Sequence, residues 1–110
     1  MEKLKLTALE EAIMLAILHQ PRYGQDIVEV VSAASEGEYQ IGCGTLYPAL
    51  RRLSQRGFIQ AQQRQENLAV RNGHSRCYYQ VTTVGRDMLL RIESIRDQIK
   101  SQSRIHEALT

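Results

Sequence analysis

The chain of 110 residues has no tryptophan, one phenylalanine and only two cysteines. It also lacks any run of about 18 apolar residues, which a membrane-spanning helix needs. Its first seven residues have no apolar stretch of the kind found in a secretory signal. Cys43 and Cys77 are too few for a disulfide framework, so a reduced, cytosolic location is the simplest interpretation. These absences exclude membrane-spanning proteins and small disulfide-rich secreted proteins.

The sequence also lacks the residue groupings that catalysis requires. No nucleophile is accompanied by a base and an orienting group, and no glycine-rich phosphate loop opens a helix. For zinc, Cys43, His74 and Cys77 offer only a His-x-x-Cys spacing and one remote thiol. We therefore predict neither an enzyme, nor a metal site, nor a cofactor.

Arginine is abundant in one segment of the chain. Residues 39–86 contain seven arginines and one acidic residue, Glu66, which gives a net charge of +6. The whole chain carries a net charge of only +2. A basic segment within a near-neutral protein is typical of proteins with a polyanionic partner, although it could also be a solvated surface. Because every basic residue of this segment is arginine, contacts with phosphates or with the edges of nucleobases are favoured.

Two helices are expected in the first third of the chain. Thr7 and Glu10 have the spacing of a capping box, and apolar residues follow at helical spacing. This helix is expected to end near His19, because a proline follows two residues later. After a turn at residues 22–24, a second helix is expected over residues 25–34. It would bury Ile27, Val30 and Val31.

Pro48 indicates where a third helix begins. Proline is tolerated in the first turn of a helix, where its missing N–H has no partner to lose. Thr45 is therefore the expected N-cap, with Pro48 at the third helical position. Gly57 stands where a C-terminal glycine is expected. The buried stripe would consist of Leu46, Leu50 and Leu53.

A hairpin and a long helix complete the pattern. Residues 58–64 and 76–82 have strand-like composition, and the loop of residues 65–75 contains Asn72-Gly73, a strong turn signal. The last helix is expected over residues 84–107, capped by Thr82 or Thr83. Its apolar residues have the spacing of a coiled-coil seam. The predicted dimerisation residues are Met88, Ile92, Ile95 and Ile99.

The length of the last helix favours a homodimer. At about 1.5 Å per residue it is too long for a small domain to cover entirely. The seam could instead cover the domain's own core. We expect pairing with a second copy of the chain.

Three short helices followed by a two-stranded hairpin is the order of elements in a winged helix-turn-helix. We expect a mainly helical α+β fold, with a DNA-binding domain over residues 1–82. Residues 83–110 would form a C-terminal dimerisation helix within the same compact domain. In this fold the third helix enters the major groove of double-stranded DNA with its N-terminal residues on the base edges. The predicted DNA contacts are Thr45, Tyr47, Arg51, Arg52, Gln55, Arg71, His74 and Arg76.

Several of these side chains have an alternative role. Adjacent residues on a helix point about 100° apart, so one of Arg51 and Arg52 is expected to face DNA while the other is ion-paired or solvated. Tyr47 could simply pack at the start of its helix. Cys43 precedes the third helix, and a thiol near a helix N-terminus could act as a redox switch. A small, partly buried apolar residue is the simpler interpretation of Cys43.

Residues 44–53 read GTLYPALRRL and are followed by GFI at residues 57–59. With RCYYQVTTVGR at residues 76–86 and PRYGQDI at residues 21–27, they resemble the signature of the PadR family of transcriptional regulators. The resemblance spans roughly residues 9–90. It implies a homodimer that binds an inverted-repeat operator, usually as a repressor.

The same resemblance suggests which residues contact DNA. It carries that role to Tyr47, Arg51 and Arg76. The chain departs from the family at Cys77 and Val84, where lysines are common, so its wing is slightly less basic. The absence of tryptophan excludes the tryptophan-lined drug pocket of some multidrug-sensing relatives.

Two other functions remain open. A winged helix can act as an adaptor that binds an acidic protein through its basic face, without sequence-specific DNA binding. The regulator could also sense a small-molecule effector held between the dimerisation helices and the domain body. The sequence has the apolar residues for such a site but no identifiable polar anchor.

Overall fold

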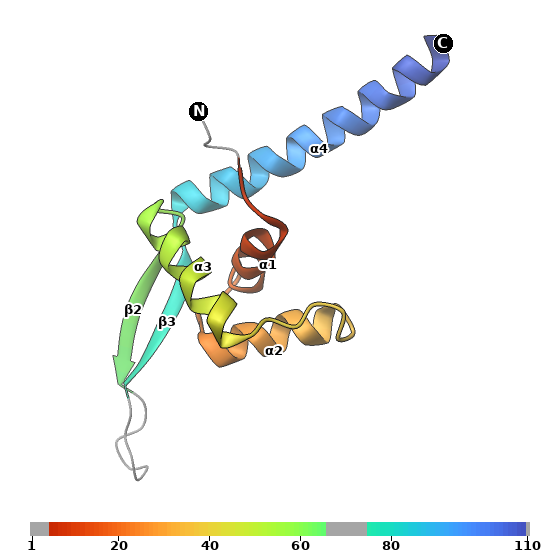
Figure 1. The fold of residues 1–110 in the computed structure, drawn as a ribbon. Coiled ribbons are helices and arrows are strands. Elements are labelled where there is room, and N and C mark those ends of the chain that lie inside the picture. The colour runs from red at the N-terminus through yellow and green to blue at the C-terminus, as the bar shows by residue number, and fades with distance from the viewer. Residues whose placement is uncertain (1–4, 66–74, 110) are drawn as a thin grey trace.

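The computed structural model describes residues 5–65 and 75–109. Figure 1 shows three short helices packed together, a hairpin at one side, and a long C-terminal helix that extends away from the other elements. This mainly helical α+β arrangement confirms the predicted fold class. In chain order the elements are α1 (Ala8–Ala16), β1 (Arg22–Tyr23), α2 (Gly24–Ala34), α3 (Cys43–Gln55), β2 (Ile59–Gln65), β3 (Ser75–Val81) and α4 (Thr83–Leu109).

The capping box of α1 forms as predicted. The backbone N–H of Glu10 donates to Thr7 Oγ1 at 3.0 Å, and the backbone N–H of Thr7 donates to Glu10 Oε1 at 2.9 Å. Two of the N–H groups left unpaired at the helix start are thereby satisfied. The helix ends at Ala16, earlier than the predicted end near His19.

The turn predicted at residues 22–24 is wrong. Arg22 and Tyr23 form strand β1, which pairs antiparallel with β3, and the sheet has the order β1-β3-β2. Gly24 is already the first residue of α2. The partner strand lies far along the chain, so local sequence gives no sign of this pairing.

Helix α3 begins earlier than predicted. Its N-cap is Gly42 and its first residue is Cys43, so the prediction of Thr45 as N-cap is wrong. Pro48 lies in the second turn, where it leaves the carbonyl of Gly44 without its helical donor. Gly44 is exposed, so water can satisfy that carbonyl and the helix tolerates the proline.

The C-terminus of α3 agrees with the prediction. Gly57 has a φ of 78°, which favours glycine. Its N–H donates to the carbonyl of Ser54, and the N–H of Phe58 donates to that of Leu53, both at 3.0 Å. This pair of bonds is a Schellman motif, which satisfies the last carbonyls of the helix and turns the chain into β2.

The core lies between the three short helices, the sheet and the first part of α4. Ile27 and Val31 are buried as predicted, whereas Val30 is only half-buried, so that expectation is corrected. The predicted stripe of α3 is confirmed, with its three leucines almost completely inaccessible. The largest fully buried side chains are Ile13, Met14, Ile17, Ile27, Leu46, Leu50 and Leu53.

Helix α4 is anchored at its start. Thr82 Oγ1 accepts from the N–H of Gly85 at 3.0 Å and donates to the carbonyl of Gly57 at 2.6 Å. A Cβ on Gly85 would overlap the carbonyl of Phe58, so only glycine fits there. Further along, both Nη atoms of Arg96 bind the carboxylate of Glu11 on α1 at 2.8 and 2.9 Å.

The predicted seam of α4 divides into two parts. Met88 and Ile92 are buried in the chain's own core, which is the alternative considered for this part of the seam. Ile95 is half-buried, and Ile99 is 62% exposed. Within the described part of the chain, no helix combines the length and hydropathy that crossing a bilayer requires.

Candidate nucleic-acid interface

The N-terminal end of α3 and the distal end of the hairpin both lie away from α4 (Figure 1). Because one side of α3 is buried through its leucines, the polar residues between them point outward. Thr45, Tyr47, Arg51 and Gln55 are all exposed. The structure therefore brings four of the predicted contacts onto one helix with a solvent-facing side.

Tyr47 is partly packed and partly exposed. The residue is 45% accessible, yet its hydroxyl lies against Gly24 at the start of α2. A Cβ at position 24 would overlap that hydroxyl. Tyr47 thus packs on α2 and remains partly exposed to solvent.

Tyr79 lies on the face of β3 that packs against the core. Burial raises the pKa of Tyr79 to about 12, and the neighbouring Cys77 and Tyr47 add to this rise. Tyr79 is therefore a neutral hydrogen-bonding group at any ordinary pH. It is the member of the Tyr78–Tyr79 pair that belongs to the core, as expected for residues on opposite faces of a strand.

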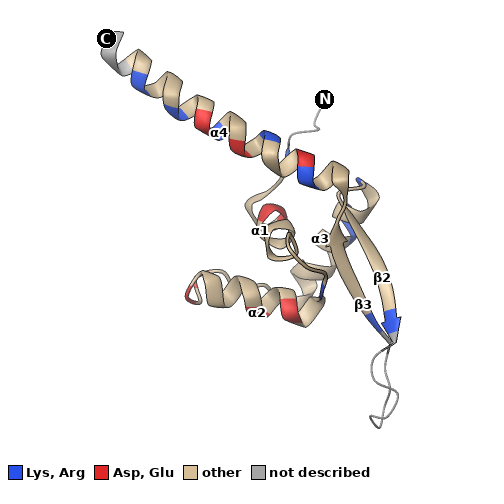
Figure 2. Cartoon of the chain, turned by 180° about the vertical axis from the view of Figure 1, so that it is seen from behind, with Lys and Arg blue, Asp and Glu red and all other residues tan. Residues whose placement is uncertain are grey.

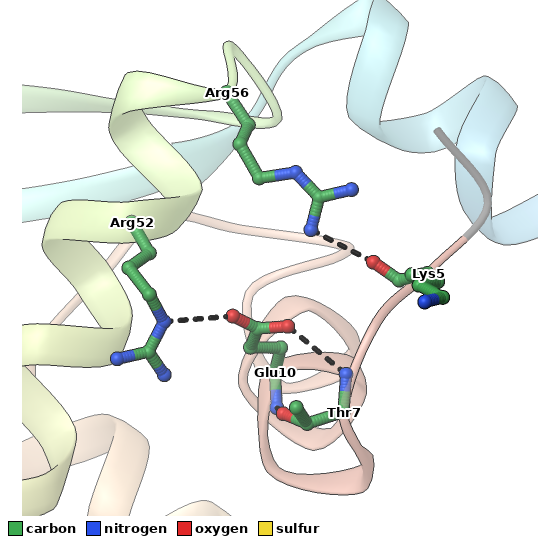
Figure 3. Close-up of polar contacts among 5 residues, drawn as sticks. All are labelled: Lys5, Thr7, Glu10, Arg52 and Arg56. Atoms are coloured by element: carbon green, nitrogen blue, oxygen red, sulfur yellow. Dashed lines mark hydrogen bonds and ion pairs between the residues drawn. The ribbon is translucent and has the colours of Figure 1, made fainter. Parts of the chain in front are cut away.

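Arg52 is the ion-paired member of the adjacent arginines (Figure 3). Its Nε binds Glu10 Oε2 at 3.1 Å, and Glu10 is buried on α1. Burial acts to raise the pKa of Glu10, but the Thr7 N–H and the Arg52 and Arg56 guanidiniums outweigh it and hold that pKa below its ordinary value. Arg52 therefore joins α3 to α1, which leaves Arg51 as the outward-facing arginine.

Two further arginines of the basic segment also hold elements together. Arg56 Nη1 donates to the carbonyl of Lys5 at 2.7 Å (Figure 3), and its guanidinium lies 4.6 Å from the centre of the Phe58 ring. Arg86 Nη2 donates to the carbonyl of Leu18 at 3.4 Å. The sequence does not separate these structural arginines from the others, because their partners lie on distant segments.

The remaining described arginines of the basic segment, which do not join elements, are Arg51, Arg64 and Arg76. All three are exposed, and within residues 5–65 and 75–109 none of them pairs with a carboxylate. Figure 2 shows basic residues at the distal ends of β2 and β3. Arg71 and His74, which are also predicted contacts, lie outside the described residues.

Sequence reasoning did not select Arg64 or Tyr23. The guanidinium of Arg64 lies 4.6 Å from the centre of the Tyr78 ring, and that of Arg76 lies 4.4 Å from the centre of the Tyr23 ring. Arg64 appears in the sequence only as one arginine among seven. The position of Tyr23 beside Arg76 can be recognised only once β1 is known to pair with β3.

Neither cysteine forms a disulfide. Cys43 is exposed at the first position of α3, and Cys77 is half-buried on β3. Among the described residues, no group of three or more histidine, cysteine, aspartate or glutamate side chains could hold a metal ion.

The chain matches the model of the transcriptional regulator PadR-like family over residues 13–91. It therefore belongs to that family, as the signature in its third helix indicates. Members of the family are transcriptional regulators, so this chain is a regulator and not an enzyme.

The chain is also similar to individual proteins. An uncharacterised protein of Lysinibacillus sphaericus is 32% identical over 81 residues, which cover 74% of this chain and 71% of the relative. A PadR-like transcription factor from Bacteroides fragilis is 28% identical, with a TM-score of 0.72 over 87% of this chain and 86% of its own.

One solved structure of the same fold contains DNA. Bacillus subtilis PadR in complex with operator DNA has a TM-score of 0.65 and 20% identity, over 76% of this chain and 46% of its own. At this identity the likeness concerns the fold alone.

Proposed function

We propose that this PadR-like regulator binds double-stranded DNA with sequence preference, as a homodimer on an inverted-repeat operator, and acts there as a repressor. The observation that carries the proposal is the outward side of α3. Tyr47 and Arg51 are exposed there, on a helix whose opposite side is buried in the core. The exposed fork of Arg51 fits a guanine edge or a phosphate, and Tyr47 and Thr45 lie at the N-terminal part that enters the groove.

The structure of Bacillus subtilis PadR with operator DNA supports this use of the fold. On this chain, we propose Thr45, Tyr47, Arg51, Gln55 and Arg76 as contacts among the described residues. Arg52 is left out of this set because its guanidinium is held by Glu10.

The exposed apolar side chains of α1 and α4 support a homodimer. Leu15 and Leu90 line a groove between these two helices and are 50% and 60% exposed. Ile99 is similarly exposed on the part of α4 that extends away from the body. A second copy would cover these side chains and place two copies of α3 on successive half-sites, as an inverted repeat requires.

Selection from a random duplex pool tests the DNA-binding proposal. We expect an enriched inverted repeat, and fluorescence anisotropy should then show that Arg51→Ala weakens binding to it by about tenfold to a hundredfold, the range for one bidentate base contact. The control is Arg104→Gln, which removes one exposed charge from α4 far from α3. Binding that is equally weak on selected and scrambled duplexes would contradict the proposal and favour the adaptor.

Light scattering tests the homodimer. Ile99→Glu places a charge on the exposed seam and should convert the dimer to a monomer at micromolar concentration. Ser101→Glu adds the same charge on the opposite side of the helix and should leave the dimer intact, since residues two apart point about 200° from each other. A wild-type chain that is monomeric, or two variants with the same effect, would contradict this interface.

A further inference from the structure

Two arginines of the hairpin directly face each other. In the antiparallel pairing of β2 with β3, Arg64 stands opposite Arg76. Like charges in this position repel and destabilise a strand pair. Neither side chain has a carboxylate partner in the part of the chain that the structure describes. The hairpin therefore holds a cross-strand pair of positive charges that nothing in these residues neutralises.

Two tyrosine rings hold these guanidiniums. Arg64 lies over Tyr78 and Arg76 lies over Tyr23, at distances that favour cation–π attraction. The two rings touch edge to face, with centroids 5.5 Å apart and planes at 71°. Tyr23 and Tyr78 are paired residues of β1 and β3, so the third strand is what brings both platforms together.

This arrangement leaves the hydrogen-bond donors of both arginines available. A ring attracts the flat face of a guanidinium, whereas the five N–H donors point outward in its plane. A phosphate group accepts hydrogen bonds from such donors in pairs, and its negative charge offsets the repulsion between two facing arginines. Because the rings limit the rotation of both side chains, less conformational entropy is lost when the anion binds.

We propose that Arg64 and Arg76 form a phosphate clamp that binds the DNA backbone, with Tyr23 and Tyr78 as its positioning residues. The proposal rests on the proposed DNA-binding function. It adds Arg64 as a contact and gives β1 a part in DNA binding. The clamp lies at the distal ends of β2 and β3, on the end of the molecule to which the start of α3 also points (Figures 1 and 2). It fixes the register of the protein on the duplex and leaves base recognition to α3.

The salt dependence of binding measures the clamp directly. The slope of log K against log salt concentration is negative, and each lost phosphate contact reduces its magnitude by about 1. The loss of a phosphate contact also weakens binding to all duplexes alike. We expect this result for Arg64→Gln and for Arg76→Gln, on both the selected and the scrambled duplex. Arg104→Gln is the matched control and should leave the slope unchanged. An unchanged slope and affinity for Arg64→Gln would overturn the clamp.

A double-mutant cycle tests the positioning role of Tyr23. Tyr23→Leu should weaken DNA binding severalfold, while Tyr23→Phe, which keeps the ring, should bind as the wild type does. In the Arg76→Gln background, Tyr23→Leu should have little further effect, because the side chain that it orients is gone. Equal losses in both backgrounds, or a loss with phenylalanine, would overturn this role, and thermal melting of each variant verifies its fold.

These outcomes separate the clamp from the function on which it rests. If Arg51→Ala abolishes sequence preference while Arg64→Gln leaves affinity and slope unchanged, the clamp alone fails. A wild-type protein that binds no duplex overturns both proposals, and an acidic protein partner for the arginine pair is then the remaining interpretation.

Discussion

Helices α3 and α4 both carry an apolar stripe, but only α3 buries the whole stripe within its own chain. Leu46, Leu50 and Leu53 are inaccessible, whereas on α4 burial ends after Ile92 and Ile99 is largely exposed. The same kind of pattern therefore has two outcomes. What distinguishes them is position, since α3 lies across the core while α4 extends past it (Figure 1).

The difference also explains which face of each helix is left for a partner. Helix α3 offers solvent a polar side with Tyr47 and Arg51, which suits an anionic and hydrogen-bonding partner. Helix α4 offers an apolar side, which suits another apolar surface. Apolar spacing in the sequence alone does not distinguish residues that pack within the chain from residues that are left exposed to contact a second copy.

The sharpest test of this comparison applies the same kind of truncation to both stripes. Leu50→Ala should lower the free energy of unfolding by about 2–5 kcal/mol, because it leaves a cavity in the core. Ile99→Ala should instead weaken the dimer by about thirtyfold, from about 1 kcal/mol of burial lost by each copy. Urea unfolding at several protein concentrations distinguishes the two effects. A concentration-independent loss for Ile99→Ala would show that its contacts lie within one chain.

A smaller effect is expected where α3 rests on α2. Gly24→Ala places a Cβ against the Tyr47 hydroxyl and should displace this ring, with about tenfold weaker binding to the selected duplex and little change in stability. Removing the hydroxyl makes room, so Gly24→Ala should cost less in a Tyr47→Phe background. Equal losses in both backgrounds, measured by anisotropy, would contradict this explanation.

The smallest effect concerns the anchor between α1 and α3. Glu10→Gln removes the negative charge that accepts from Arg52 and from the Thr7 N–H, and should lower the free energy of unfolding by about 1 kcal/mol at neutral pH. The folded state lowers the pKa of Glu10, so its stabilising effect is present above the ordinary value of 4.5 and is lost as the pH falls below it.

Urea unfolding across a pH series checks this prediction. The wild-type and Glu10→Gln curves should run parallel near neutral pH and converge below pH 4.5. Glu93→Gln is the control, because Glu93 is exposed on α4. A difference between wild type and Glu10→Gln that persists at low pH would show that packing, not charge, accounts for the loss.

Some features could be predicted because their causes are local. The capping box of Thr7 and Glu10 spans a single helical turn, and Gly57 ends α3 through bonds to residues just before it. The three leucines of α3 and the two strands of the hairpin follow from side-chain periodicity. The outward position of Tyr47 and Arg51 follows from the same leucines, since burying one side of a helix exposes the other.

Other features depend on residues that are distant in sequence. Strand β1 has only two residues and exists because β3 pairs with it, so Tyr23 as a platform for Arg76 could not be foreseen. Helix α3 starts at Cys43, before the position that Pro48 predicts, and the exposed Gly44 allows it to tolerate the loss of one bond there. The adjacent arginines were expected to differ, but only packing against Glu10 shows that Arg52 is the one held.

Periodicity and local turn signals were thus enough to predict the helices, the hairpin and the outward side of α3, though not the end of α1 or the start of α3, because each of these elements arises within a few residues along the chain. The basic segment divides into Arg52, Arg56 and Arg86, which join distant segments, and Arg51, Arg64 and Arg76, which donate to no carboxylate or carbonyl of the described residues, and this division required the packed molecule. All six are the same residue type, and only the neighbours that folding brings to each one make their roles different.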